Sequence, residues 1–146
     1  MATSTYTVIR GGRLLDIKGH RAEAQDILIE ADSIAAIGAP GMAAPADARV
    51  VDAANRLMHP GLMNAHTHGH GNLAKGMGDR WTLELLLTAA PWIGGNRTLE
   101  DKYLTTVIGA AEMLLKGCTG CYDLYYEFPA PTVDGLDAVG RAYRDM

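Results

Sequence analysis

Three histidines stand within five positions of this 146-residue sequence, in the stretch HPGLMNAHTHGHGN (59–72). Residues two apart on a strand project from the same face, so His66 and His68 would present their imidazoles side by side. Neutral imidazole is a common ligand of zinc and of iron. The pair, at the end of a short apolar strand, therefore predicts a metal site.

His70 keeps the same parity only if the strand continues, and the glycines on either side of it indicate that the strand ends there. We therefore expect His70 to be a loop neighbour of the pair and not a ligand. Solvated loop histidines are the alternative for all three. The Pro60-Gly61 turn and the apolar residues that lead into the pair favour a site.

Strand and helix patterns alternate from His59 onward and would position this pair. Apolar segments at 61–66 and 118–126 predict strands. Periodic segments predict helices at 82–90, where Pro91 stops the helix, at 98–117 and at 132–146. Such alternation with short links predicts a parallel sheet.

The helix at 98–117 has the clearest pattern. Thr98 is a plausible N-cap, acidic residues follow in the first turn, and Gly117 is a natural stop. The residues that repeat at helical spacing, and so are expected to face the core, are Leu99, Tyr103, Thr106 or Val107, Ala110 and Leu114.

The first sixty residues have a different pattern, with short β-rich segments broken by Gly, Asp or Pro. These segments are 6–10, 13–17, 26–30, 33–38 and 49–53, with a tight hairpin around Ala31-Asp32. They predict an antiparallel sandwich or part of one. The change of pattern at His59 predicts two domains, 1–58 and 59–146.

The stretch HPGLMNAHTHGHGNLAKGM resembles the first barrel strand and following loop of the amidohydrolase superfamily, in its cytosine deaminase-like and chlorohydrolase branch. Pro60-Gly61, Asn64, the two histidines and Lys75-Gly76 carry the resemblance. Residues 97–125 resemble the long helix and second strand of that branch, and the strand-rich first sixty residues match the small sandwich that precedes its barrel.

The resemblance implies an α/β fold, in which a small N-terminal β-sandwich is followed by the start of a metal-dependent (β/α)8 TIM-type barrel. Only two strand–helix units are present, whereas such a barrel needs about 250 residues. The chain is therefore expected to be the N-terminal portion of a larger enzyme. The sandwich would be completed by C-terminal strands.

By the family pattern, His66 and His68 are the first two ligands of one divalent metal, with zinc favoured and iron as the alternative. No histidine follows His70, so the remaining ligands and the proton-handling aspartate are expected beyond residue 146. The metal in this family activates a water molecule for attack on an sp² carbon.

The function expected from this resemblance is hydrolysis of a non-peptide C–N bond by a deaminase of a purine, pyrimidine or triazine-like ring. A ring-opening cyclic amidohydrolase of the hydantoinase or imidazolonepropionase type is the enzyme alternative. An inactive fragment or binding module that needs a second chain is the alternative of another class. Asn72 and Trp92 are candidates for substrate contact, although loop aromatics more often serve packing.

Two further pairs of reactive residues lie on the second predicted strand or just after it. Cys118 and Cys121 have the spacing of a redox or zinc site, but residues three apart on a strand face opposite sides, so we expect structural cysteines. Asp123 and Glu127 fall at or just past the end of this strand. At Asp123 we expect structural hydrogen bonding rather than a catalytic role.

Composition excludes several classes of partner. The net charge is -4 and the basic residues are scattered, which argues against nucleic acid and anionic membranes as partners. No apolar run approaches the roughly 20 residues that span a bilayer. With two cysteines and no secretory signal pattern, we expect a cytoplasmic, disulfide-free enzyme. We expect it to act on a small heterocyclic molecule and to assemble as a homo-oligomer.

Overall fold

The structure is a computed structural model that describes residues 5–146. It divides into two compact units, Met1–Pro60 and Gly61–Met146. The first unit consists of strands and the second alternates strands with helices. Within the described residues, no helix is long and apolar enough to cross a membrane.

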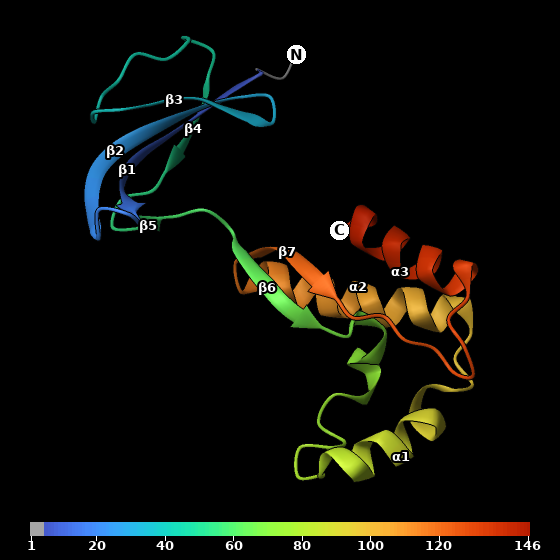
Figure 1. The fold of residues 1–146 in the computed structure, drawn as a ribbon. Helices are drawn as coiled ribbons and strands as arrows, with labels where there is room; N and C mark the ends of the chain where they lie inside the picture. The colour runs from blue at the N-terminus through green and yellow to red at the C-terminus, as the bar shows by residue number, and fades with distance from the viewer. Residues whose placement is uncertain (1–4) are drawn as a thin grey trace. The chain divides into compact units, whose positions relative to one another are not determined.

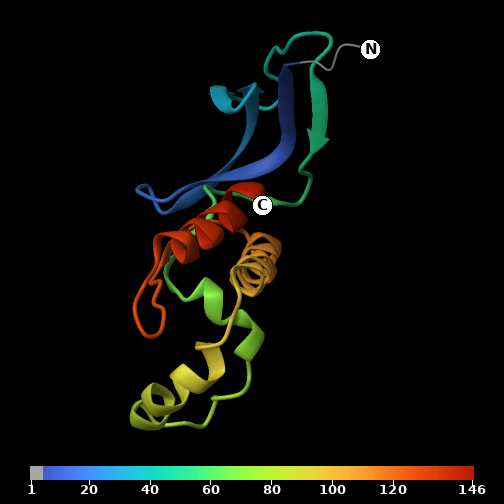
Figure 2. The same ribbon diagram turned by 90° about the vertical axis from the view of Figure 1, so that its right-hand side faces the viewer.

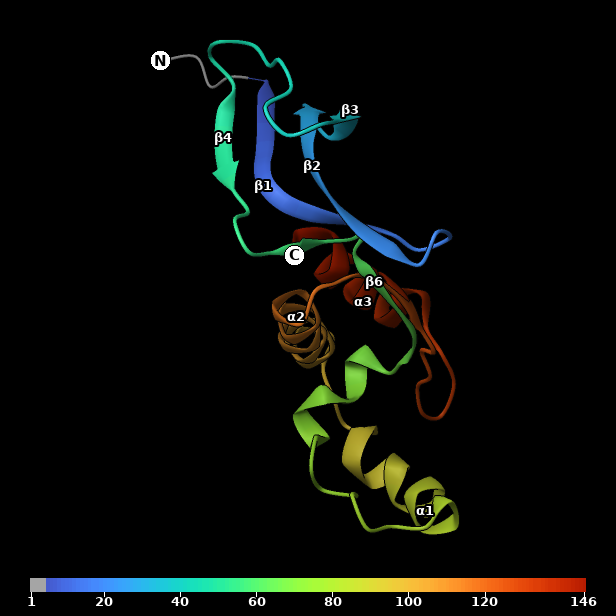
Figure 3. The same ribbon diagram turned by 90° about the vertical axis from the view of Figure 1, so that its left-hand side faces the viewer.

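The first unit is one five-stranded sheet in the order β3-β2-β1-β4 (Figure 3), and β5 also pairs with β1. Its strands are β1 (Tyr6–Asp16), β2 (Arg21–Glu30), β3 (Ser33–Gly38), β4 (Arg49–Asp52) and β5 (Leu57–Met58). The two hairpins are antiparallel, as expected, but β4 and β5 run parallel to β1. The antiparallel prediction is therefore wrong for these two pairs. The long segment after β3 carries the chain across the sheet, so that β4 enters in the direction of β1.

The two strands predicted at 6–10 and 13–17 are halves of a single bent strand. The register between β1 and β2 shifts between Ile9 and Gly12, and Gly11 there has a φ of +80°. A glycine takes that conformation without strain, so the bulge bends the strand without ending it. Figure 1 shows β1 and β2 curving together.

The core of this first unit contains a buried charge beside apolar side chains such as Val8 and Ile27. Asp26 is 1% exposed, and its carboxylate accepts hydrogen bonds from Arg10 at 2.5 Å and from the Gly41 amide at 2.8 Å. Burial alone would raise the pKa of Asp26, but these hydrogen bonds hold its pKa below the usual value.

The second unit is built on two parallel strands, β6 (Leu62–Thr67) and β7 (Cys118–Asp123), as the alternating pattern predicts. Its helices are η1 (Gly69–Ala74), α1 (Leu83–Gly94), α2 (Leu99–Leu115) and α3 (Val133–Asp145). Helix α2 packs against both α3 and η1, and Figure 2 shows α2 and α3 side by side. The 3-10 helix η1 follows the histidine pair directly.

The ends of α2 confirm the local sequence signals. Thr98 and Asp101 form a reciprocal capping box, and Gly117 takes a φ of +82° just after the helix. The predicted stop of α1 at Pro91 is wrong, because the helix continues to Gly94. Proline there leaves only the carbonyl of Leu87 without its helical donor, and Leu87 is exposed, so water can bind that carbonyl.

The buried face of α2 also differs from the predicted apolar stripe. Leu99 and Leu114 are exposed, although Ala110 is buried as expected. The residues buried on this helix are Lys102, Thr105, Thr106, Gly109 and Ala110. Small side chains allow η1 to approach closely: a Cβ on Gly109 would lie 1.9 Å from the amide nitrogen of Asn72. The predicted face is therefore correct at Thr106 and Ala110 and wrong at its two terminal leucines, because close packing here favours small and polar side chains.

Candidate metal centre and the adjoining cavity

The imidazoles of His66 and His68 converge at the C-terminal end of β6. Their Nε2 atoms are 3.2 Å apart, and the rings meet edge to face with centroids 5.0 Å apart. Two nitrogens bound to one tetrahedral zinc ion at the usual Zn–N length would be about 3.3 Å apart. The spacing of the two Nε2 atoms thus fits two ligands of a single metal ion.

The orientation of the His68 ring is set by the chain that follows β7. Nδ1 of His68 lies 2.7 Å from the carbonyl oxygen of Leu124. A carbonyl can only accept, so Nδ1 carries the proton and Nε2 keeps its lone pair, the arrangement that suits a metal-binding histidine. The amide of Leu124 in turn donates to the carbonyl of Thr67 at 2.8 Å.

The turn after His68 is held by an acidic side chain. The buried Gly69 donates its amide proton to Oδ2 of Asp123 at 3.1 Å, and the hydroxyl of Tyr143 donates to the same oxygen at 2.6 Å. Asp123 is the last residue of β7. It makes the structural hydrogen bonds expected of it from the sequence.

The described residues supply only part of a metal coordination shell. Across residues 5–146, no group of three or more His, Cys, Asp or Glu side chains is arranged to hold a metal ion. Cys118 and Cys121 are both free and half-buried. A catalytic zinc usually takes three protein ligands, so the histidine pair supplies two of the donors that such a centre needs.

A cavity of about 760 Å³ opens beside the histidine pair, within the second unit. Helix α1 contributes apolar side chains such as Leu86, Leu87 and Ile93, and the segment after β7 contributes Tyr125, Tyr126 and Phe128. His68 lies in the lining, so the cavity reaches the candidate metal site. A largely apolar cavity with a few polar groups is typical of a site for a small organic molecule.

Of the two candidate substrate residues, the structure brings only Asn72 to this cavity. The Asn72 side chain lines it and donates a hydrogen bond to the carbonyl of Gly69 at 2.8 Å. Trp92 is 88% exposed and does not belong to the lining, because it projects from another side of α1 than the residues that face the cavity. Trp81, just before α1, is the tryptophan that lines the cavity.

His70 also lines the cavity, a role that its position in a loop did not reveal. Its ring meets the edges of Tyr125 and Tyr126, with centroids 5.1 and 4.5 Å away. Both of its ring nitrogens are buried and have no hydrogen-bond partner within the described part of the chain. Burial lowers the pKa of His70, which favours the neutral ring.

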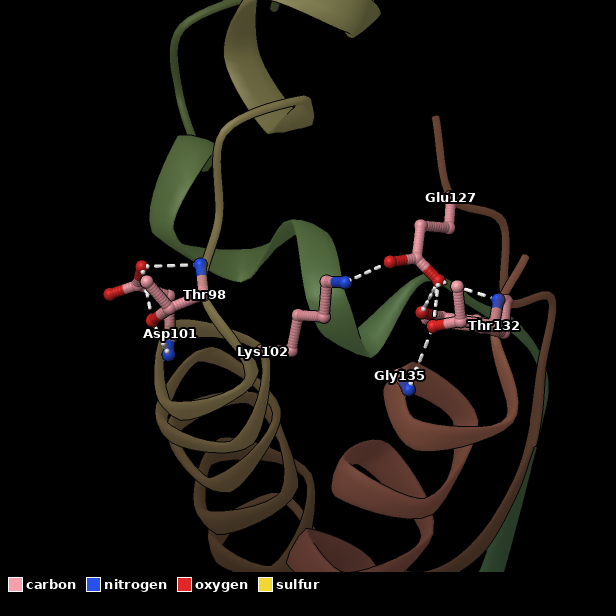
Figure 4. A network of polar contacts seen from close by, with 7 residues as sticks. Thr98, Asp101, Lys102, Glu127, Thr132 and Gly135 are labelled. Atoms are coloured by element: carbon pink, nitrogen blue, oxygen red, sulfur yellow. Dashed lines mark hydrogen bonds and ion pairs between the residues drawn. The ribbon is translucent and has the colours of Figure 1, made fainter. Parts of the chain in front are cut away.

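A buried ion pair between Lys102 and Glu127 forms a polar part of the cavity wall (Figure 4). The two side chains are 10% and 13% exposed. Glu127 also accepts hydrogen bonds from the Tyr125 hydroxyl at 2.9 Å and from the amide and hydroxyl of Thr132 at 2.8 Å. The hydrogen bond from Lys102 is the largest cause that lowers the pKa of Glu127, to about 2.

Sequence reasoning missed this pair and the network around it. Thr132 is the N-cap of α3, so the network joins α2, the segment after β7 and the start of α3. The sequence did offer one signal, because Lys102 shares a helical face with Thr105, Thr106 and Gly109. Small and polar residues at helical spacing indicate a closely packed face, where a lysine needs an acidic partner.

The chain is similar in sequence and in structure to several known proteins. No family model matches the chain. The sequence and structure matches confirm the predicted resemblance to the amidohydrolase superfamily, in the part of it that holds deaminases and triazine hydrolases.

Two curated relatives illustrate the sequence match. A 5-methylthioadenosine/S-adenosylhomocysteine deaminase of Symbiobacterium thermophilum is 38% identical over 143 residues, which is 94% of this chain and 31% of that protein. A 5'-deoxyadenosine deaminase of Methanocaldococcus jannaschii is 35% identical over 120 residues, which is 79% of this chain and 29% of that protein. The chain therefore spans about a third of the length of these relatives.

Among solved structures, the atrazine chlorohydrolase of Arthrobacter aurescens TC1 complexed with zinc matches with a TM-score of 0.78 and 29% identity. The match covers 95% of this chain and 33% of that one. A triazine hydrolase variant matches with a TM-score of 0.82 and 28% identity, over 97% of this chain and 34% of that one.

Proposed function

We propose that the chain is part of a metal-dependent hydrolase that deaminates a purine, pyrimidine or triazine-like ring. The observation that carries this proposal is the 3.2 Å separation of the two Nε2 atoms beside an apolar cavity. The relatives support the reaction class, since they are named as deaminases of adenosine-type compounds and as triazine or atrazine hydrolases.

The proposed architecture has residues 59–146 as the first two strand–helix units of a (β/α)8 barrel. Residues 1–58 would be part of a β-sandwich that further strands complete. The parallel pairing of β6 with β7 and the helix between them support the barrel. The histidines then lie at the C-terminal ends of the strands, the face where barrel enzymes place their active sites.

His66 and His68 are the proposed metal ligands, with zinc favoured over iron because one of the similar structures is described as complexed with zinc. When bound, the metal would supply Lewis-acid activation of water. The other roles fall to groups of this chain. The carbonyl of Leu124 keeps Nε2 of His68 available, and α1 lines the cavity with apolar side chains.

The cavity suits a flat ring with an apolar substituent. The edges and faces of Tyr125, Tyr126 and Trp81 offer stacking surface, and the leucines of α1 offer apolar contact. Asn72 supplies a polar contact next to the histidine pair. We propose Asn72 as a residue that contacts the substrate, directly or through its bond to Gly69.

The test is ammonia release by the complete zinc-loaded enzyme, of which residues 1–146 form a part, from a panel of amino-purines, aminopyrimidines and amino-triazines. We expect release from at least one class, and a loss of more than about 100-fold in kcat/KM for His66→Ala and for His68→Ala. His59→Ala is the matched control, because His59 is exposed and its hydrogen bond within residues 5–146 is to its own neighbour Pro60. Ammonia release that survives both ligand substitutions would contradict the proposal.

A further inference from the structure

Asp123, the last residue of β7, and Leu124, which follows it, hydrogen-bond to the three consecutive residues Thr67, His68 and Gly69. Leu124 contacts Thr67 through its amide and His68 through its carbonyl. Asp123 contacts Gly69 through its carboxylate. The direction in which His68 presents Nε2 therefore depends on where β7 ends, 54 to 56 residues further along the chain.

The space around Gly69 is filled by this arrangement. A Cβ on Gly69 would lie 2.5 Å from the Tyr143 hydroxyl and 2.7 Å from Oδ2 of Asp123. Tyr143 belongs to α3, and its hydroxyl, which also lies next to Gly69, donates a hydrogen bond to the same carboxylate oxygen. The side chain of Asp123 thus holds the turn after His68, and Tyr143 of α3 fixes that side chain by a hydrogen bond.

Some buried polar atoms around Gly69 lack a hydrogen-bond partner. Among the described side chains, the buried nitrogen or oxygen atoms without a hydrogen-bond partner are Oδ1 of Asp123 and the two ring nitrogens of His70. Both residues adjoin Gly69, one by its hydrogen bond and one in sequence. Buried unpaired polar atoms cost stability, and folds that keep them often do so at functional sites.

We propose that Asp123 is a positioning residue for the metal centre. It holds the amide of Gly69, with Tyr143 as its brace, and so fixes the backbone from which His68 extends. The inference rests on the proposed function, because it takes His66 and His68 to be metal ligands. Within the described residues, the carboxylate of Asp123 hydrogen-bonds to Gly69 and Tyr143 and to neither ligand ring, so it acts through the turn.

The test compares four variants of the chain, each with a single substitution. Asp123→Ala removes the acceptor, and Asp123→Asn keeps one acceptor oxygen. Tyr143→Phe removes the brace, together with the contact of its hydroxyl with Cys121. Tyr103→Phe is the matched control, because the Tyr103 hydroxyl also joins α2 to α3, through Asp145 at 2.9 Å, without touching Gly69. Zinc affinity is measured by competition with a chromophoric chelator, beside the thermal unfolding temperature and the hydrogen exchange of the Gly69 amide.

We expect Asp123→Ala to weaken zinc binding by about 10- to 100-fold and to speed exchange of the Gly69 amide. Asp123→Asn should recover most of both, and Tyr143→Phe should lie between wild type and Asp123→Ala. Tyr103→Phe should lower the unfolding temperature without changing the zinc affinity or the exchange rate of the Gly69 amide. Unchanged zinc affinity in Asp123→Ala, or an equal loss in Tyr103→Phe, would overturn the proposal.

The metal-free readings separate this inference from the proposed function. Failure of the wild-type chain to bind zinc counts against the proposed metal centre. The positioning role is then decided by the ¹⁵N chemical shifts of His68 without metal, which report whether Nδ1 carries the proton. Asp123→Ala should disturb that tautomer while Tyr103→Phe preserves it, and an unchanged tautomer in Asp123→Ala would overturn the inference. If Asp123→Ala does not fold, the zinc affinity and the His68 tautomer of Tyr143→Phe decide the question by the same criteria, with Asp123→Asn as the conservative comparison.

Discussion

The Nε2 atoms of His66 and His68 lie 3.2 Å apart, while Nδ1 of His68 binds the carbonyl of Leu124 at 2.7 Å. The second contact explains the first, because it fixes the His68 ring with its free nitrogen toward His66. Metal binding then needs little rearrangement of either side chain, which lowers the entropy lost on binding. The pair is in this sense preorganised by the chain that follows β7.

The close packing of α2 against η1 predicts the effect of a substitution at Gly109 on stability. In an exposed helix, alanine is more stable than glycine by about 1 kcal/mol. At Gly109 a Cβ would lie 1.9 Å from the Asn72 amide nitrogen, so Gly109→Ala should instead destabilise the second unit by about 1–3 kcal/mol. Urea unfolding measures the change.

Gly140→Ala is the control for this prediction. Gly140 lies in α3, and a Cβ there meets only the end of the flexible Arg144 side chain, at 3.4 Å. We expect Gly140→Ala to raise the free energy of unfolding by several tenths of a kcal/mol, up to about 1. Equal effects of the two substitutions would show that Asn72 does not pack against α2 as described.

The Lys102–Glu127 pair gives a prediction about pH. Pairing lowers the pKa of Glu127 from 4.5 to about 2. A lowered pKa in the folded state means that the charged form stabilises the fold above about pH 4.5 and that this stabilisation is lost as the pH falls toward 2. Unfolding of the wild type should therefore become easier across that window.

Glu127→Gln removes the part of this dependence that comes from Glu127. It should lower the free energy of unfolding at pH 7 by about 3 kcal/mol, because Lys102 is left buried without its partner, and should make the curve between pH 4.5 and 2 shallower. Glu100→Gln is the control, since Glu100 is exposed in the first turn of α2. A Glu127→Gln protein with the acid profile of the wild type would contradict the role of the pair.

The two tryptophans give a prediction about the cavity. Trp81 lines it, whereas Trp92 is exposed and outside the lining. With 5'-methylthioadenosine or atrazine as the probe, the fluorescence of the Trp92→Phe chain, which retains only Trp81, should be quenched on binding. The Trp81→Phe chain should respond weakly. Equal quenching of the two variants would place the ligand outside this cavity.

The parts of the molecule that the sequence predicts well are those set by near neighbours. The cap at Thr98, the stop at Gly117 and the two-residue spacing of His66 and His68 all depend on contacts within a few positions. Each such signal acts within one turn or one strand, so its type and spacing in the sequence are sufficient.

The features that the sequence did not predict depend on distant segments. The partner of His68 is a backbone carbonyl, and every residue has one, so no residue type marks Leu124. Glu127 and Lys102 are 25 positions apart and could each have been a solvated surface charge. The parallel course of β4 likewise follows from a loop whose sequence shows only that it is a loop.

The most direct measurement is a zinc titration of the ¹⁵N-histidine-labelled chain, followed by NMR. We predict that the Nε2 resonances of His66 and His68 shift together and saturate at one equivalent of zinc, while those of His20 and His59 stay in place. Zinc that leaves the His66 and His68 signals unmoved, or that shifts His20 and His59 instead, would contradict the assignment of this pair as metal ligands.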